Sequence, residues 1–219
     1  MEGLQTVVRE TGADAKQTVL WLHGLGADGH DFEGIVPELV RPHWPALRFV
    51  FPHAPVRPVT VNGGMRMRAW YDILGMDLAS KQDEAGIRDS VQRIEQLVDL
   101  EVSAGRQVLL AGFSQGGAIT LATALISRRP ILGLVVLSSY LPLDLRLFEG
   151  ADPTAFERPL FMAHGRFDPV VPQALGELSR DRLQARGFQV DWHSYPMAHQ
   201  VCLEEIRALG DWFEQHLFD

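Results

Sequence analysis

One stretch in the middle of the chain limits its possible folds more than any other feature. The apolar run Val108–Ala111 enters the turn Gly112-Phe113-Ser114-Gln115-Gly116, and a helical pattern follows over Ala118–Ser127. A buried strand, a Gly-x-Ser-x-Gly turn and a helix in this order place the serine on a sharp turn at the end of the strand. Gly112 and Gly116 are expected because the turn leaves no room for side chains beside the serine. We therefore expect Ser114 to have a strained backbone and an outward-pointing hydroxyl.

Short apolar runs alternate with longer amphipathic segments along the rest of the chain. Continuous Val/Leu/Ile/Phe runs are typical of strands buried on both faces, and Asp83–Ala104 has apolar residues four, three and four positions apart, which form one helical stripe. The first few strands suggest a meander or hairpin, and the rest follows a β-α-β pattern. This predicts the α/β class, with a mostly parallel central sheet and helices on both faces, in one domain over residues 1–219. The expected strands are Leu4–Glu10, Gln17–Leu22, Leu47–Phe51, Gln107–Gly112, Gly133–Ser138, Leu160–His164 and Gln189–Tyr195, and the further helices are Gln173–Arg186 and Val201–Leu217.

The segment Pro52–Lys81 does not fit this alternation. It is long, interrupted by Pro and Gly, and rich in Met, Trp and Tyr. Long ordered loops in compact domains are uncommon and are often functional.

Charge and cysteine content exclude several classes of protein. The formal net charge is −8 and no cluster of Lys and Arg offsets it, which argues against nucleic-acid binding. The single cysteine, Cys202, cannot form an internal disulfide, which favours a reducing compartment and a cytoplasmic location. The N-terminus has no signal-peptide pattern, and no apolar run approaches the ~20 residues needed to span a bilayer, so we expect no stable membrane insertion.

The run Gly24-Leu25-Gly26-Ala27-Asp28-Gly29 matches the Gly-x-Gly-x-x-Gly pattern of dinucleotide-binding turns and follows a strand-like segment. That use requires an acidic residue at the end of the next strand to hold the ribose hydroxyls. The next strand, Leu47–Phe51, is followed by Pro52 and His53 instead. Two readings remain at this point, a structural strand-to-helix turn and a turn whose exposed amides bind an oxyanion.

A serine nucleophile needs a base, and the base needs an orienting carboxylate. Asp168 follows the strand ending at His164, at the edge where parallel sheets place their sites, and Pro169 and Pro172 stiffen its loop. Asp168 is therefore the expected acid, and the alternative is that it only caps the following helix. The competing carboxylates, Asp144, Asp152 and Asp191, lie in a less regular stretch or within a strand.

His199 is the expected general base, and then the general acid. It lies between the last strand and the last helix, in a loop that should open at the same edge of the sheet as Ser114 and Asp168. Histidine exchanges protons near neutral pH, as both steps require. His164 ends a strand but precedes the acid, His43 and His53 lie upstream in loops near proline, and His193 lies within the last strand. No His or Cys spacing suggests a metal site, and no cofactor is expected.

Together these segments resemble the carboxylesterase/acyl-protein thioesterase family of α/β hydrolases over nearly the whole chain. The matching segments are Leu22–Gly26, Met67–Asp72, Gly112–Gly117, Gly165–Val171 and His199. The resemblance implies a small α/β hydrolase with little or no cap domain, with Ser114 as nucleophile, Asp168 as acid and His199 as base. It also implies that the amides of Leu25 and Gln115 form the oxyanion hole.

The same resemblance implies that Pro52–Lys81 borders the acyl site. Met65, Met67, Trp70, Leu74 and Met76 are then candidates for an apolar acyl surface, and the alternative is that they only cover the sheet. The expected function is a serine carboxylesterase acting on small or lipid-like esters with short to medium acyl chains. The alternatives are an acyl-protein thioesterase or lysophospholipase, and a non-catalytic binding protein. An exposed acyl groove could double as a homodimer contact.

Overall fold

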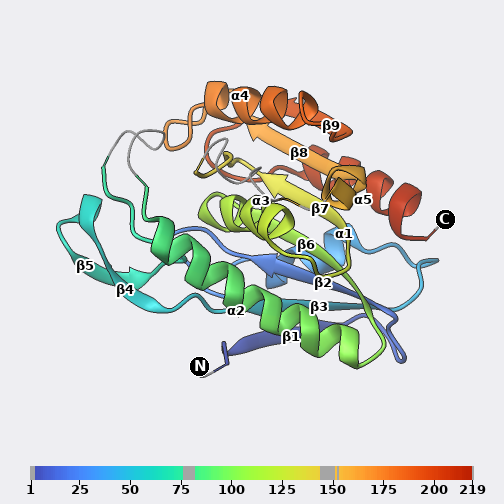
Figure 1. Ribbon diagram of the computed structural model, residues 1–219. Coiled ribbons are helices and arrows are strands. Elements are labelled where there is room, and N and C mark those ends of the chain that lie inside the picture. The colour runs from blue at the N-terminus through green and yellow to red at the C-terminus, as the bar shows by residue number, and fades with distance from the viewer. Residues whose placement is uncertain (1–2, 76–81, 144–150, 152, 219) are drawn as a thin grey trace.

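Seven strands form one sheet in the spatial order β1-β3-β2-β6-β7-β8-β9 (Figure 1). The computed structural model describes residues 3–75, 82–143, 151 and 153–218. Neighbouring strands are parallel except at the edge, where β1 is antiparallel to β3. The sheet confirms the predicted mostly parallel α/β class. Its strands are β1 (Thr6–Glu10), β2 (Gln17–Leu22), β3 (Leu47–Pro52), β6 (Gln107–Phe113), β7 (Ile131–Leu137), β8 (Leu160–Gly165) and β9 (Val190–Tyr195).

The expected hairpin of the first strands is wrong. β3 lies between β1 and β2, and it pairs with β2 in parallel, with Gln17 opposite Leu47. The connection from β2 to β3 contains the 3₁₀ turn Glu33–Ile35 and the short helix α1 (Val36–Leu39), neither of which was expected from the sequence. A crossover of this length allows parallel pairing, which a tight turn does not.

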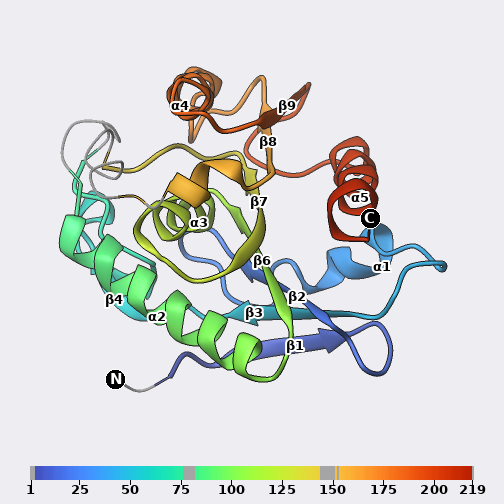
Figure 2. The ribbon, with the colours of Figure 1, turned by 45° about the vertical axis from the view of Figure 1, so that its right-hand side comes forward.

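Helices cover both faces of the sheet (Figure 2). Successive side chains of a strand belong to two different cores, one on each face. Leu20 and Leu22 of β2 join one core, while Val19 and Trp21 join the other. The first core packs under α2, α3 and α4, and the second under α1 and α5. The helices are α2 (Glu84–Ser103), α3 (Gln115–Ile126), α4 (Gln173–Gln184) and α5 (Leu203–Leu217).

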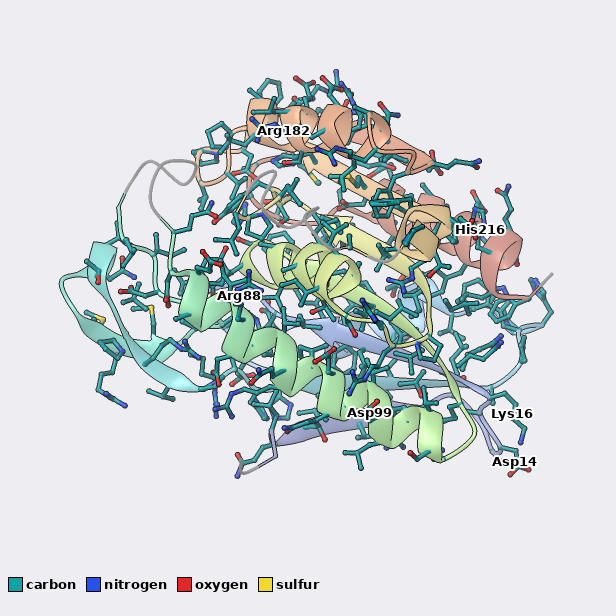
Figure 3. The ribbon with its side chains drawn as sticks, viewed as in Figure 1. Asp14, Lys16, Arg88, Asp99, Arg182 and His216 are labelled. Carbon is teal, nitrogen blue, oxygen red and sulfur yellow. The ribbon has the colours of Figure 1, made fainter. Side chains whose placement is uncertain are left out.

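The expected stripe on α2 is buried as predicted. Ile87, Val91, Ile94 and Val98 all belong to the first core. Asp83 caps the helix, because its Oδ1 accepts a hydrogen bond from the amide of Gly86 at 2.9 Å. The outer face carries charge instead, including Arg88 and Asp99, which are labelled on this helix in Figure 3.

Part of the segment Pro52–Lys81 is a β-hairpin that the sequence did not indicate. Strands β4 (Val56–Val59) and β5 (Met65–Arg68) pair antiparallel, apart from the main sheet (Figure 1). The turn between them uses Gly63 and Gly64, both with positive φ, at 66° and 78°. A left-handed backbone of this kind favours glycine. Residues 76–81 lie outside the described part of the chain.

Three backbone segments approach one another closely where β6 turns into α3. A Cβ atom added at Gly116 would lie 2.3 Å from the carbonyl oxygen of Leu22, at the end of β2. A Cβ atom at Gly112 would lie 2.4 Å from the carbonyl group of Gly116. Both distances are far below van der Waals contact, so the prediction that these two positions require glycine is confirmed.

One carboxyl group is buried beneath the start of α5. Glu205 is fully buried, and its Oε2 accepts a long hydrogen bond of 3.4 Å from the amide of Cys202. Its other oxygen has no hydrogen-bond partner within the described part of the chain. Burial raises the pKa of Glu205 to about 8, which means that the folded protein holds this group protonated at neutral pH.

We expect Gly116→Ala to lower the free energy of unfolding by about 3 kcal/mol, because a backbone atom must move to admit the methyl group. Gly34→Ala is the matched control, since no atom lies within 4 Å of a Cβ added there. Urea unfolding measures both variants. Unfolding of Gly116→Ala and wild type at the same urea concentration would contradict the close packing.

Glu205 should make the protein less stable as pH rises from about 4.5 to about 8. Over that window the unfolded chain has lost a proton that the folded chain retains, so the free energy of unfolding falls, by up to a few kcal/mol. Glu205→Gln should remove this decline. The free energy of unfolding of Glu205→Gln, relative to that of the wild type, should therefore rise with pH up to about 8 and then level off. The neighbouring exposed substitution Glu204→Gln should leave the decline in place, and a pH-independent difference between Glu205→Gln and the wild type would contradict the assignment.

Candidate active site

Ser114 occupies the turn between β6 and α3 with a strained backbone. Its φ is 54° and its ψ is −121°, in a region that residues other than glycine rarely adopt. Two hydrogen bonds hold it there: its amide donates to the carbonyl of Leu137 at 2.9 Å, and the Ser139 hydroxyl donates to its carbonyl at 2.6 Å. The expected strain at this serine is confirmed.

The three residues expected to form a triad are in contact. Nε2 of His199 lies 2.9 Å from the Oγ atom of Ser114, and Nδ1 lies 2.7 Å from Oδ2 of Asp168. When Nδ1 carries the ring hydrogen and donates it in a hydrogen bond to the carboxylate of Asp168, Nε2 is left to accept the serine proton. The ring of Phe113 packs on the imidazole at 4.7 Å between centroids and limits its movement.

The buried carboxylate of Asp168 is held by its own loop. Its Oδ1 accepts hydrogen bonds from the amides of Val170 and Val171, at 2.8 and 2.9 Å. Its side chain is completely shielded from solvent, so these donors supply the hydrogen bonds that water would otherwise provide. Asp168 lies before α4, but its oxygens accept hydrogen bonds from its own loop and contact His199. These hydrogen bonds do not support the alternative that Asp168 only caps the helix.

The buried side chain of His164 also holds the loop of Asp168 in place. Its Nε2 donates to the carbonyl of Val171 at 2.8 Å. Burial lowers the pKa of His164, which favours the neutral ring that this single donation requires. The sequence favoured His199 over His164 as the base, and no sequence signal showed that His164 holds the loop of Asp168.

The glycine-rich run after β2 faces Ser114. A Cβ atom added at Gly24 would lie 3.4 Å from Cβ of Ser114. Gly26 has a φ of 80°, and its amide donates to the carbonyl of Arg68 at the end of β5, at 2.9 Å. Among the described residues, the amides of Leu25 and Gln115 donate to no protein acceptor, and both residues line the same cavity as Ser114. Unpaired amides beside a serine hydroxyl are what an oxyanion hole requires.

A buried network ties this turn to the hairpin. The Gln115 side chain accepts from the amide of Trp70 and donates to the carbonyl of Tyr71, both at 2.8 Å. The indole of Trp70 donates to the carbonyl of His23 at 2.9 Å. Burial lowers the pKa of His23 to about 4, so its ring is neutral and its Nε2 accepts from the amide of Ala54 at 3.1 Å. The network positions the segments on both sides of the expected oxyanion hole.

The expected acyl-binding residues are largely misplaced. Trp70 is 0% exposed and belongs to the core and the network above, so it cannot contact a substrate in this structure. Met65 is 64% exposed on the hairpin, and neither it nor the half-buried Leu74 lines the cavity at Ser114. Met76 lies outside the described residues. The periodic patterns of a sequence do not show which aromatic side chains of an irregular segment turn inward, and that is where these expectations fail.

A cavity of about 230 Å³ lies beside Ser114. Its wall is mostly apolar and joins the glycine-rich turn after β2, the segment after β5 and the loop of Asp168. The lining residues are Leu25, Val61, Asn62, Tyr71, Ile73, Gly75, Ser114, Gln115, Tyr140, Val170 and Val171.

No group of three or more His, Cys, Asp or Glu side chains in the described ranges could hold a metal ion. No helix among the same residues combines the length and the apolar character needed to cross a bilayer.

Comparison with known proteins identifies the family of this chain. The sequence profile of the phospholipase/carboxylesterase family matches residues 4–217. Acyl-protein thioesterase 1 of Neurospora crassa is 40% identical over 212 residues, which cover 91% of this chain and 86% of the relative. A probable carboxylesterase of Oryza sativa subsp. japonica is 36% identical over 205 residues, covering 91% of this chain and 77% of the relative. The crystal structure of Zea mays acyl-protein thioesterase 2 matches with a TM-score of 0.85 at 31% identity, over 99% of this chain and 100% of that one. The chain therefore belongs to the phospholipase/carboxylesterase family of α/β hydrolases.

Proposed function

We propose that this protein is a serine hydrolase that cleaves carboxylic esters through an acyl-enzyme formed on Ser114. The observation that carries the proposal is the continuous contact from Ser114 through His199 to Asp168, at 2.9 and 2.7 Å. A non-catalytic binding protein does not need this arrangement beside two unpaired amides. The family assignment supports a hydrolase without naming its substrate.

In the first step, the Ser114 hydroxyl attacks the ester carbonyl while Nε2 of His199 accepts its proton. Asp168 holds the imidazole in the tautomer that this transfer needs and stabilises the imidazolium that results. The negative charge on the carbonyl oxygen is stabilised by the amides of Leu25 and Gln115. Removing one such donor typically costs about 10²–10³ in rate.

In the second step, the imidazolium of His199 protonates the departing alcohol, and the acyl group remains on Ser114. Water then enters, His199 accepts its proton, and the same amides hold the second oxyanion. The carboxylic acid leaves and the serine recovers its proton. The cavity beside Ser114 would take a short to medium chain against its apolar wall.

A thioester is the second candidate substrate. Its support is specific, because relatives that are 34–40% identical to this chain are named acyl-protein thioesterase 1. The triad geometry serves both substrates, since the thiol is a better leaving group than the alcohol.

A cytoplasmic location and a homodimer remain predictions from the sequence.

The first test is hydrolysis of 4-nitrophenyl esters over a series of acyl lengths. We expect activity in the wild type, a preferred chain length, and a loss of roughly 10⁶ in kcat for Ser114→Ala, because the nucleophile is gone. Ser103→Ala, at the exposed end of α2, is the matched control and should retain wild-type rates. Equal rates for wild type and Ser114→Ala would reject the assignment of the nucleophile.

A matched oxygen ester and thioester of one preferred acyl group then separate the two substrate classes. The ratio of their kcat/KM values is divided by the ratio of their rates with hydroxide, which removes the difference in intrinsic reactivity. A corrected ratio that favours the thioester by more than about tenfold would make the thioesterase the better description, and a ratio near one or below supports the carboxylesterase.

A further inference from the structure

Two tyrosines that line the cavity beside Ser114 are in contact through their hydroxyls. Tyr71 follows β5 and Tyr140 follows β7, and their hydroxyl oxygens lie 2.8 Å apart. The two residues are 1% and 6% exposed, and both line the cavity that contains Ser114. The mechanism proposed above uses neither hydroxyl.

Among the described residues, one of the two hydroxyl hydrogens of this pair is left without an acceptor. Each phenol carries one proton, and the contact between them uses only one of the two, whichever oxygen is the acceptor. Within the described ranges, neither hydroxyl has another protein partner. A buried donor without an acceptor is costly, so an occupant of the cavity that offers an acceptor gains a hydrogen bond.

Both phenols are protonated, and therefore able to donate, at neutral pH. Burial holds the pKa of Tyr71 well above its ordinary range. Burial also raises the pKa of Tyr140. The pair is fixed in place from one side, because the carbonyl of Tyr71 accepts from the Gln115 side chain at 2.8 Å.

Much of the rest of the cavity wall cannot supply this interaction. Leu25, Val61, Ile73 and Val170 present apolar side chains. The side-chain amide of Gln115 is already used on both sides, by the amide of Trp70 and the carbonyl of Tyr71. The side-chain amide of Asn62, which also lines the cavity, donates to Sδ of Met67 at 3.4 Å. A polar donor in an apolar wall distinguishes ligands by the position of one oxygen.

We propose that the Tyr71–Tyr140 pair determines specificity by donating a hydrogen bond to an oxygen on the part of the substrate that occupies the cavity. The preferred substrates are then esters or thioesters that carry a ketone or ether oxygen several bonds from the scissile carbonyl, rather than plain hydrocarbon chains. This inference rests on the proposed hydrolase function and specifies its substrate class.

The test compares 4-nitrophenyl octanoate with its analogues carrying a ketone at carbon 5, 6 or 7. For each analogue, the ratio of its kcat/KM to that of the parent is divided by the same ratio for hydroxide. We expect the wild type to prefer the ketone at one or more positions by about tenfold, the effect of one neutral hydrogen bond. In the double variant Tyr71→Phe/Tyr140→Phe, the corrected ratio should fall to about one.

Tyr195→Phe provides the matched control, because Tyr195 is the third tyrosine of the chain and lies in β9, outside the cavity wall. It should keep the wild-type ratio. If the double variant does not fold, the two single variants take its place, and at least one should lose the preference, since only one of the two phenols donates to the substrate.

A wild type without preference for any ketone position would overturn the inference, and this result needs no variant. A preference that survives in the double variant, or in both single variants, would overturn it as well. The proposed function fails separately, because it predicts hydrolysis of the parent octanoate ester whatever the ratio. Absence of all ester hydrolysis would reject the function, and hydrolysis without preference would reject only the role of the tyrosine pair.

Discussion

The close backbone approach at Gly116 is the constraint on which the rest of the site depends. Here the first turn of α3 lies against the end of β2, so near that a Cβ atom would be 2.3 Å from the carbonyl of Leu22. This approach brings the residues after β2 beside the residue after β6. The same contact therefore sets the position of Ser114 and that of the turn containing Leu25, although 89 positions (114 − 25) separate them in the sequence.

Two hydrogen bonds maintain the strained backbone of Ser114. One joins its amide to the carbonyl of Leu137 at the end of β7, and the other joins its carbonyl to the hydroxyl of Ser139 just beyond β7. The network of Gln115, Trp70 and His23 then fixes the glycine-rich turn after β2 from the side of the hairpin. His164 fixes the loop of Asp168 in the same indirect way. Such supporting groups hold reacting atoms to within a few tenths of an ångström, which is what transition-state stabilisation by fixed donors requires.

The strand, turn and helix around Ser114, and the placement of Asp168 and His199 after later strands, could be predicted because these features are local. A Gly-x-Ser-x-Gly turn has one geometry, and the carboxyl ends of parallel strands meet at one edge. The pairing of β1 with β3 could not be predicted in the same way, because it depends on contacts between segments that are distant in the sequence. It also depends on the length of the crossover through α1. The hairpin β4–β5 was missed because its strands are short and one contains Pro58. Trp70 was assigned to the substrate surface, although burial and two hydrogen bonds place it in the core.

The central claim is that Ser114 carries the acyl group during turnover, and trapping that intermediate tests it most directly. The wild-type protein is mixed with a 4-nitrophenyl ester, quenched in acid within milliseconds, and its intact mass and proteolytic peptides are measured. We predict a mass increase equal to the acyl group, located on the peptide that contains Ser114, together with a burst of 4-nitrophenol of about one equivalent per chain if deacylation is the slower step. An acyl group found on another residue would contradict the account, whatever the rate of hydrolysis.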